Sequence, residues 1–341
     1  MSAPQSPPKT STSALITVMR LDGKGGASQL AEDDIRHAWQ HDESSLWLHL
    51  DFGQPNIGYF LDDIAQLEPA VKEALIEEYV RPRVARFPGG LMTTLRGVDL
   101  RPGATPDKLI SLRIWLTPNR LITLRRRQLP VIKTICDDLA KGHGPASLTE
   151  VITQTADMMV DQLGSLLEEM NQVLGRYEEG ILDNEDITTN QLAHLRRPMG
   201  TLTRFIQPQA DCLNRLGESS MGMNERHRIA FREIANHLSR YLEDLKAMQD
   251  RTMMLQEQMS SLHSERLNSR MYMMSLITTL FLPLTFLTGL LGVNVGGVPG
   301  VNNHFAFWWV VIISAVSMAV AFGALSAIKL YNRRRWRREN R

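Results

Sequence analysis

The stretch that decides the fold is MYMMSLITTLFLPLTFLTGLL, residues 271–291, which opens a run without any charged side chain between Arg270 and Lys329. A membrane-spanning helix needs about 20 mostly apolar residues. The run holds a second such segment, FAFWWVVIISAVSMAVAFGALSAI, at residues 305–328. The GVNVGGVPGVNNH sequence between them contains Gly, Pro and Asn, which break helices. The pattern predicts two transmembrane helices, at 271–292 and 305–328, with an outer loop at 293–304.

The tail at residues 329–341 fixes the expected orientation. It carries seven Lys and Arg side chains and a single acidic one, Glu339. A basic cluster next to an apolar segment is typical of the cytoplasmic flank of a membrane helix. We therefore expect a lipid bilayer as partner and no nucleic acid. Two crossings then place both termini in the cytoplasm of a multi-pass protein of a bacterial-type inner membrane.

The amino-terminal part shows a different pattern. Segments of alternating apolar and polar residues predict strands, and they lie at 14–21, 46–52, 90–100, 109–117 and 120–126. Helical patterns lie at 31–40 and 62–78. This order predicts a cytoplasmic α/β domain over residues 14–145, with an α+β arrangement as the alternative. Residues 1–13 are rich in Pro, Ser and Thr, which predicts a disordered tail.

Residues 146–270 predict a cytoplasmic helical stalk. Gly and Pro are scarce there, whereas Leu, Met, Gln and Glu favour helix. Two long helices precede a turn at 217–224, where Asn224 is a candidate N-cap. The third helix begins near Glu225 and meets no proline before Pro283, so we expect it to continue into the membrane. At 1.5 Å per residue, the helix from Glu225 to Leu291 would be about 100 Å long.

One face of this third helix is polar or small throughout. Steps of three and four residues keep side chains on one face. Starting from Asp250, they reach Met254, Glu257, Ser261, Ser264, Asn268, Met271, Ser275, Thr278, Leu282, Thr285 and Gly289. This stripe has two interpretations: a close-packed helix interface whose hydroxyls bond their own backbone, or a water-filled axis shared by several copies. In the second, Asp250 and Glu257 form carboxylate rings in a vestibule; in the first, they lie on an ordinary solvated face.

A resemblance to a known family rests on the TGLLGVNVGGVPG stretch, residues 288–300, which closes the first span behind the stalk. With LWLHLDF and RPRVAR in the amino-terminal part, it resembles the CorA superfamily of divalent-cation transporters. The signature of that superfamily is Gly-Met-Asn, and here the tripeptide is Gly292, Val293 and Asn294. The valine and the GGVPG loop are similar to the zinc-transporting ZntB branch.

The resemblance implies a funnel-shaped homopentamer whose first spans surround a central pore. The tripeptide would form the selective outer mouth, where the Asn294 amide binds a hydrated dication without removing its water. The implied lining comprises Asn268, Met271, Met274, Thr278, Leu282 and Thr285, to which the stripe adds Ser275 and Gly289. Met274 and Ser275 are adjacent, so both cannot point fully inward. The branch implies zinc uptake, coupled to protons.

The ligand chemistry leaves the transported ion open. Zinc prefers sulfur and nitrogen ligands, whereas oxygen ligands and retained water suit magnesium. No Cys or His lies in the implied lining, so zinc rests on the resemblance and magnesium is the alternative. His304 is the one titratable side chain of the outer loop and is either a metal ligand or a plain loop residue.

Enzymatic and redox functions have little support. The chain has no phosphate-binding glycine loop, no nucleophile elbow and no HExxH motif. Cys136 and Cys212 are far apart and predict no disulfide framework. We expect no enzyme and no cofactor. The alternative of a different class is a membrane-anchored metal or ligand sensor, in which the hairpin serves as a tether.

Overall fold

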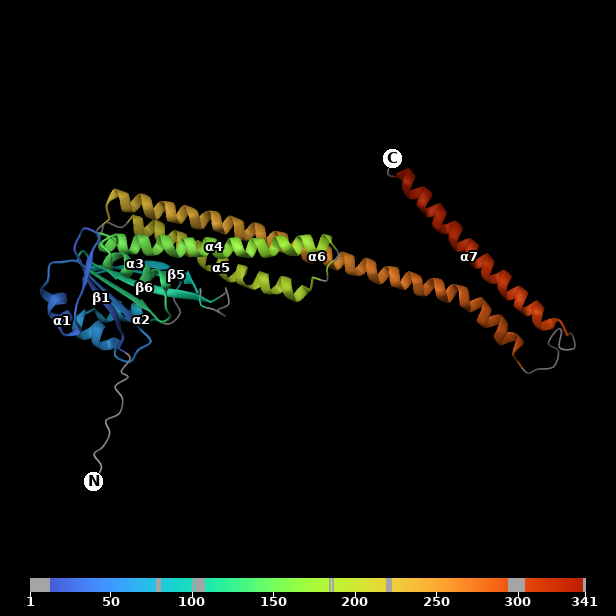
Figure 1. Cartoon of the computed structure of the whole chain (residues 1–341), viewed down its shortest axis with the longest axis horizontal. Coiled ribbons are helices and arrows are strands. Elements are labelled where there is room, and N and C mark those ends of the chain that lie inside the picture. Colours follow the sequence, from blue (N-terminus) through green and yellow to red (C-terminus); the bar gives the residue numbers. More distant parts are fainter. Residues whose placement is uncertain are drawn as a thin grey trace, which may run out of the picture. The chain divides into compact units, whose positions relative to one another are not determined.

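The computed structural model describes residues 13–77, 81–99, 101, 108–183, 185, 187–218, 223–293 and 304–339, with Ala306 and residues 324–339 described by their backbone alone. The chain divides into two compact units, Met1–Gln256 and Glu257–Arg341, and Figure 1 shows their elements. Residues 1–12 of the predicted tail and 294–303 of the predicted loop lie outside the described residues.

The first unit contains a mixed sheet. Within the described ranges it has seven strands in the order β2-β1-β3-β7-β6-β5-β4. The β3–β7 pair is parallel and the other pairs are antiparallel. The strands are β1 (Leu15–Leu21), β2 (Ala27–Gln29), β3 (Leu46–Asp51), β4 (Arg83–Phe87), β5 (Gly90–Val98), β6 (Leu109–Leu116) and β7 (Arg120–Arg125).

Helices cover both faces of the sheet (Figure 1). Leu48 and Leu50 of β3 point into one core with Ile35 of α1 (Glu32–His41), Phe60 of η1 (Tyr59–Ile64) and Leu75 of α2 (Pro69–Ile76). The opposite face is covered by α3 (Pro130–Ala140), α4 (Leu148–Leu182) and α5 (Thr189–Gly217). Because side chains alternate along a strand, β3 buries residues on both faces.

The helix predicted over residues 62–78 is wrong in its extent. The structure has a short π-helix, η1, followed by α2, which begins at Pro69. Gln66 between them has a φ of 50°, outside helical geometry. Proline is favoured at the first position of a helix, where its missing N–H is not needed, so α2 begins at Pro69. The sequence patterns also missed β2, β4 and α3.

The long helices follow the sequence pattern more closely. The Ser147 hydroxyl caps α4 by accepting from the Glu150 amide at 3.2 Å, and Thr188 caps α5 in a capping box. The third helix, α6 (Glu225–Leu291), begins at the predicted residue. The Asn224 side chain accepts from the His227 amide at 2.9 Å, so its predicted role as an N-cap is confirmed.

The second unit contains the end of α6 and the helix α7 (Ala306–Glu339). Pro283 lies inside α6 and cannot donate to the carbonyl four residues earlier. The ribbon of α6 curves over this part in Figure 1, as a missing backbone hydrogen bond allows.

Candidate functional site: the uncovered face of the long helix

The chain covers only one face of α6. Buried side chains recur at steps of three and four residues, from Phe231 through Leu238 and Leu245 to Thr252 and Leu255. They pack into the first unit. From residue 256 to residue 293 none of the described side chains is buried. Among the residues that the structure describes, the second half of α6 therefore buries no side chain against its own chain.

Three consecutive residues show how the uncovered face is oriented. The Gln249 amide donates to the Thr203 hydroxyl of α5 at 3.1 Å. Arg251 donates to both carboxylate oxygens of Glu178 on α4, at 2.8 and 2.6 Å, and this bond raises the pKa of Arg251. Asp250 between them is exposed. Because successive helical residues are about 100° apart, α5 and α4 flank α6 on two sides and Asp250 faces away from both.

The predicted vestibule residues lie on this uncovered face. Met254 is 66% exposed, and Asp250 and Glu257 are exposed as well. Asp250 and Met254 each lie two residues, or about 200° of helix, from the buried Thr252. A single chain does not bring two copies of these carboxylates together, so the rings remain a prediction.

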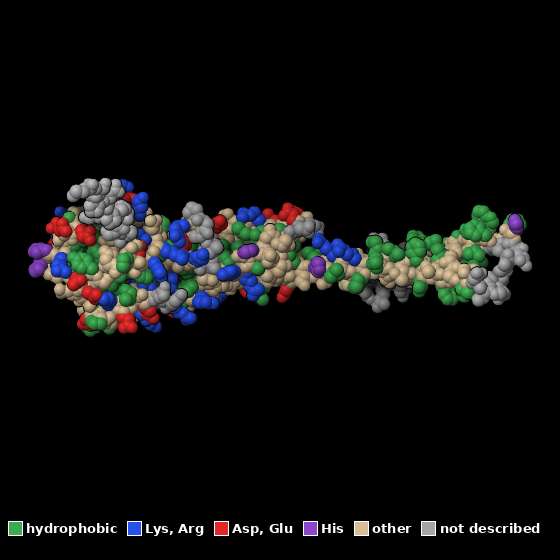
Figure 2. All heavy atoms as spheres, turned by 90° about the horizontal axis from the view of Figure 1, so that it is seen from below, with side chains coloured by type: hydrophobic (Ala, Val, Ile, Leu, Met, Phe, Trp, Pro, Cys, Tyr) green, Lys and Arg blue, Asp and Glu red, His purple; other side chains and the backbone are tan. Residues whose placement is uncertain are grey.

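The membrane segment of α6 is apolar and uncovered. Among the described residues, α6 is the one helix long and apolar enough to cross a membrane, and α7 holds a shorter apolar stretch at Phe307–Gly323. Figure 2 shows hydrophobic side chains along this part, preceded by basic ones. All of the predicted lining residues are exposed in the single chain: Asn268, Met271, Met274, Ser275, Thr278, Leu282, Thr285 and Gly289.

The threonine hydroxyls in this segment share one geometry. Each donates its proton to the backbone carbonyl four residues earlier, which leaves the oxygen free to accept hydrogen bonds. The bonds are Thr278 to Met274 at 3.0 Å, Thr279 to Ser275 at 2.8 Å, Thr285 to Phe281 at 2.9 Å and Thr288 to Leu284 at 2.9 Å. This geometry fits both a close-packed helix interface and a water-filled lining, so it does not distinguish the two interpretations of the stripe.

The tripeptide follows the end of α6. The Gly292 amide donates to the Thr288 carbonyl at 3.0 Å, and a Cβ on Gly292 would lie 3.1 Å from the same oxygen. A side chain there would crowd the last turn. Val293 is 49% exposed, and Asn294 lies outside the described residues.

No metal centre is apparent in the part of the chain that the structure describes. No three His, Cys, Asp or Glu side chains gather there with a geometry that could hold a metal ion. His304 is exposed in a turn just before α7. Its role as a metal ligand remains a prediction.

The first unit contains a buried histidine that sequence reasoning missed. His49 on β3 is 1% exposed, and its Nδ1 lies 2.7 Å from the Thr123 hydroxyl of β7. That hydroxyl accepts from the Trp47 indole at 2.8 Å. Burial, with a smaller effect of the Arg125 charge, lowers the pKa of His49 to about 3. The ring is therefore neutral and structural.

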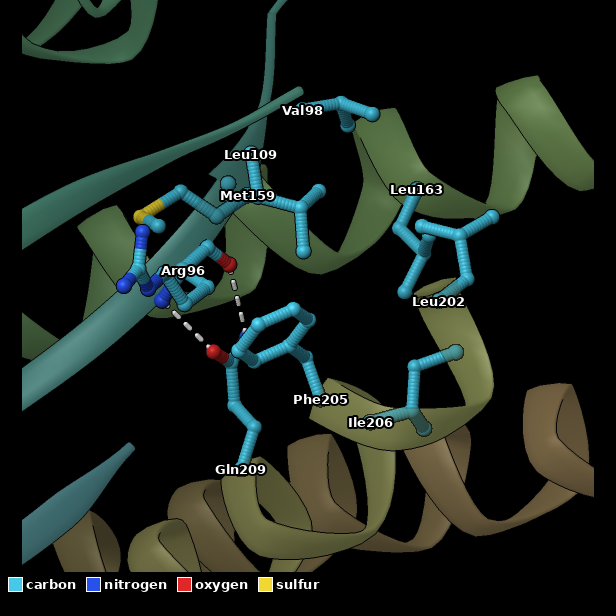
Figure 3. Close-up of a pocket in the computed structure, with 10 residues that line it drawn as sticks. Arg96, Val98, Leu109, Met159, Leu163, Leu202, Phe205, Ile206 and Gln209 are labelled. Carbon is cyan, nitrogen blue, oxygen red and sulfur yellow. Dashed lines mark hydrogen bonds between the residues drawn. The ribbon is translucent and has the colours of Figure 1, made fainter. Parts of the chain in front are cut away.

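The pocket in Figure 3 lies between strands β5 and β6 of the sheet and the helices α4 and α5. Gln209 of α5 binds the backbone of Arg96 on β5, accepting from its amide at 2.6 Å and donating to its carbonyl at 3.0 Å. These bonds continue the ladder of β5 beyond the end of β4, which pairs only as far as Thr94. The cavity of about 20 Å³ is mostly apolar and has room for about one water molecule. We interpret this cavity as a small gap in the packing of the helices against the sheet, and not as a ligand site.

A sheet domain that leads through a helical stalk into an exposed, charge-free helical segment defines a class of membrane protein with a soluble domain ahead of its anchor. The family described as "CorA-like Mg2+ transporter protein" matches residues 42–326. The chain therefore belongs to the CorA family, whose members are transporters and not enzymes. The resemblance to this superfamily and its ZntB branch is confirmed.

Individual relatives of known name within this family are similar to most of the chain. The chain is 35% identical over 289 residues to "Zinc transport protein ZntB" of Yersinia enterocolitica, covering 84% of this chain and 87% of the relative. It is 35% identical over 292 residues to "Divalent cation transporter CmaX" of Pseudomonas aeruginosa, covering 84% and 88%. The solved structure of full-length CmaX matches with a TM-score of 0.81 and 33% identity, over 94% of this chain and 100% of that one.

Proposed function

We propose that several copies of this chain, five in number, form a passage for hydrated zinc through the inner membrane. The observation that carries the proposal is the polar stripe of α6, which crosses a charge-free segment where none of the described side chains is buried. Membership of a family of divalent-cation transporters supports it. The name of the ZntB relatives favours zinc.

In this proposal α6 and α7 form a membrane hairpin. The end of α6 and the apolar start of α7 are the two spans, and the loop between them faces outward. The basic residues at 329–341 keep the end of α7 in the cytoplasm. The first unit then lies on the same side, together with the amino terminus.

A single hairpin cannot enclose water, so the stripe needs other copies of itself. The helix backbone and the hydroxyl protons are satisfied within α6, but the hydroxyl oxygens of the stripe can still accept hydrogen bonds, which lipid does not supply and protein or a wet cavity does. Five α6 helices with their stripes inward would surround such a cavity. Thr278, Thr285 and Ser275 would line it, and Asp250 and Glu257 would form acidic rings on the cytoplasmic side.

The chemistry of the lining suits a cation that keeps its water. In the first hydration shell the water oxygens face the cation, so the protons point outward. The Thr278 and Thr285 oxygens are free to accept those protons, because each hydroxyl donates to its own backbone. Asn294, with Gly292 and Val293 beside it, would offer amide oxygens at the outer mouth. Retained hydration avoids the large cost of placing a bare dication in hydrocarbon.

Zinc rather than magnesium is the proposed cargo, although the lining has no sulfur or nitrogen ligand. Hydrated transport removes this conflict, because the protein then binds water and not the metal. Coupling to protons is part of the proposal, and His304 is the titratable group nearest the mouth in the sequence.

The test uses two adjacent threonines with the same internal hydrogen bond. Thr278 lies on the stripe and Thr279 lies about 100° away from it. We expect Thr278→Val to lower zinc flux into proteoliposomes about tenfold, as the loss of one hydrogen bond of roughly 1.4 kcal/mol would. Thr279→Val serves as the matched control and should leave the flux within about twofold of wild type.

Two outcomes would overturn the proposal. Equal effects of the two substitutions would mean that the stripe does not line the passage. No zinc flux with wild-type protein would favour the tethered sensor. Asn294→Ala tests the mouth in the same assay, where we expect flux or selectivity to be lost. Competition by magnesium, with and without a pH gradient, tests the choice of ion and the coupling.

A further inference from the structure

The two flanks of α6 in the first unit differ in charge. On one side, Arg251 binds Glu178 and Asn171 of α4. On the other, Gln249 binds Thr203 of α5. The uncovered face lies between these contacts, so one flank of the unit belongs to α4 and the other to α5.

The α4 flank is acidic. Its exposed carboxylates are Asp157, Asp161, Glu168 and Glu179 of α4, together with Asp244 of α6. Burial and the charge of Asp161 raise the pKa of Asp157. Burial, with Asp161 and Asp244, also raises the pKa of Tyr241. Burial is the main cause of both shifts, and the neighbouring carboxylates add to it.

The α5 flank is basic. Its exposed side chains include Arg197, Arg204 and Arg215, and α5 contains no Glu and one Asp, Asp211. On α6 the exposed Lys246 lies one helical turn before Gln249, on the α5 side. This flank therefore carries the opposite charge to the α4 flank.

The two charged rows match in length and level. Asp161 to Glu179 on α4 and Arg197 to Arg215 on α5 each span about 27 Å of helix. Glu168 lines a groove with Met248 and Arg251 of α6. Arg204 follows Thr203, which binds Gln249 of α6. Glu168 and Arg204 thus lie at the same level of α6, on opposite flanks.

A groove at the α4 flank offers space for a partner side chain. It has a volume of about 340 Å³ and lies between α4 and α6. Glu168, Tyr241 and Asp244 are among its lining residues. A long basic side chain entering it would meet the carboxylates of Glu168 and Asp244. Arg251, which also lines the groove, is already paired with Glu178.

We infer that the α4 flank of one copy docks against the α5 flank of the next copy, with Glu168 and Arg204 at the centre of the contact. The inference rests on the proposed function, because a ring with the uncovered faces of α6 inward brings these unlike flanks together. A closed ring requires such a pair of different, complementary surfaces. The contact would also fix the neighbour's orientation, since like flanks would repel.

The test is a charge swap. An acid-reversed variant carries Asp161→Lys and Glu168→Lys, and a base-reversed variant carries Arg204→Glu and Arg215→Glu. We expect each to lower the fraction of intact oligomer about tenfold at low salt, measured by native mass spectrometry in detergent. A variant with all four substitutions restores complementarity and should recover most of the oligomer. Glu169→Lys, exposed on α4 about 100° from Glu168, is the matched control and should leave the oligomer intact.

The outcomes separate this inference from the proposed function. Wild-type oligomer and zinc flux, with no loss of oligomer in either reversed variant, would overturn the docking contact alone. Additive loss in the four-substitution variant would also overturn it, because complementarity predicts recovery. A monomeric wild type without flux would instead contradict the proposed function.

A cross-linking experiment avoids dependence on the folding of reversed variants. Glu168→Cys and Arg204→Cys are combined with Cys136→Ser, while Cys212 stays in place because it is buried. A short bis-maleimide should then give a ladder of covalent oligomers. Either new cysteine alone should give none, because unlike flanks meet in the ring. Absence of a ladder from the double-cysteine chain would overturn the contact.

Discussion

Acidification should destabilise the first unit through His49. The side chain is 1% exposed, and its pKa is lowered from 6.5 to about 3, mainly by burial. In the unfolded chain the imidazole takes up a proton below pH 6.5, whereas in the folded chain it stays neutral down to about pH 3. Stability that is complete above pH 6.5 is therefore lost as the pH falls toward 3.

The size of the effect follows from the shift. One pKa unit corresponds to about 1.4 kcal/mol. At pH 4.5 the solution is two units below the ordinary value of 6.5 and still above the folded value. We expect His49 to cost about 3 kcal/mol of unfolding free energy between pH 7.5 and pH 4.5.

The assay compares denaturant unfolding of the full chain in detergent with that of His49→Gln. Glutamine does not titrate and can still bond the Thr123 hydroxyl, which lies 2.7 Å from His49 Nδ1. Carboxylates titrate in both proteins, so their contribution cancels in the difference. Wild type should lose about 3 kcal/mol more than the variant on acidification. Parallel pH profiles would refute the reasoning, because they would mean that the folded protein binds the proton as readily as the unfolded chain.

Three further substitutions test the packing of the first unit. Arg120→Ala should lower the unfolding free energy by about 3 kcal/mol, because the guanidinium donates to the carbonyls of residues 38, 39, 42 and 44 at the end of α1. Gly90→Ala should cost about 1–3 kcal/mol, since its Cβ would overlap the buried Trp115 ring. Gln209→Leu should cost about 2–4 kcal/mol, because the Arg96 amide and carbonyl lose the partners that bind them at 2.6 and 3.0 Å.

Each of these substitutions has a control in denaturant unfolding. Arg120→Lys keeps the positive charge but not the several N–H donors of the planar guanidinium, so it should recover only part of the loss. Gly200→Ala, in helix α5 with open space around the new Cβ, should raise stability by roughly 0.5–1 kcal/mol. Gln207→Leu, at an exposed position, should change stability by less than about 0.5 kcal/mol. Losses in the controls as large as those in the tests would contradict the packing argument.

The sequence predicted the elements whose periodicity is long and regular. The strand patterns at 46–52 and 120–126 correspond to β3 and β7, and α6 begins at Glu225 as expected. The sequence patterns did not predict the shorter elements β2 and α3. β2 has three residues, too few to show alternation, and α3 begins with Pro130 in a segment rich in β-branched residues.

The candidate site was predictable to the extent that it lies on one helix. Steps of three and four residues identify the stripe, because helix geometry alone puts those positions on one face. The ion pair between Arg251 and Glu178 was not predictable, since the two residues are 73 positions apart in the sequence. The same holds for the unlike flanks, which depend on how α4 and α5 pack beside α6. The predicted rings of Asp250 and Glu257 would form between several copies of the chain. The structure of a single chain does not test them, so they remain a prediction.

The central claim is that the stripe of α6 faces a shared, water-filled passage. The most direct measurement is the reaction of single introduced cysteines with a water-soluble thiol reagent in zinc-loaded proteoliposomes, in a chain that carries Cys136→Ser and keeps the buried Cys212. Cysteines at Thr278 and Thr285 should react rapidly and block zinc flux, whereas cysteines at Thr279 and Thr288 should react slowly and leave the flux intact. Rapid reaction at Thr279 and Thr288, with Thr278 and Thr285 protected, would contradict the claim.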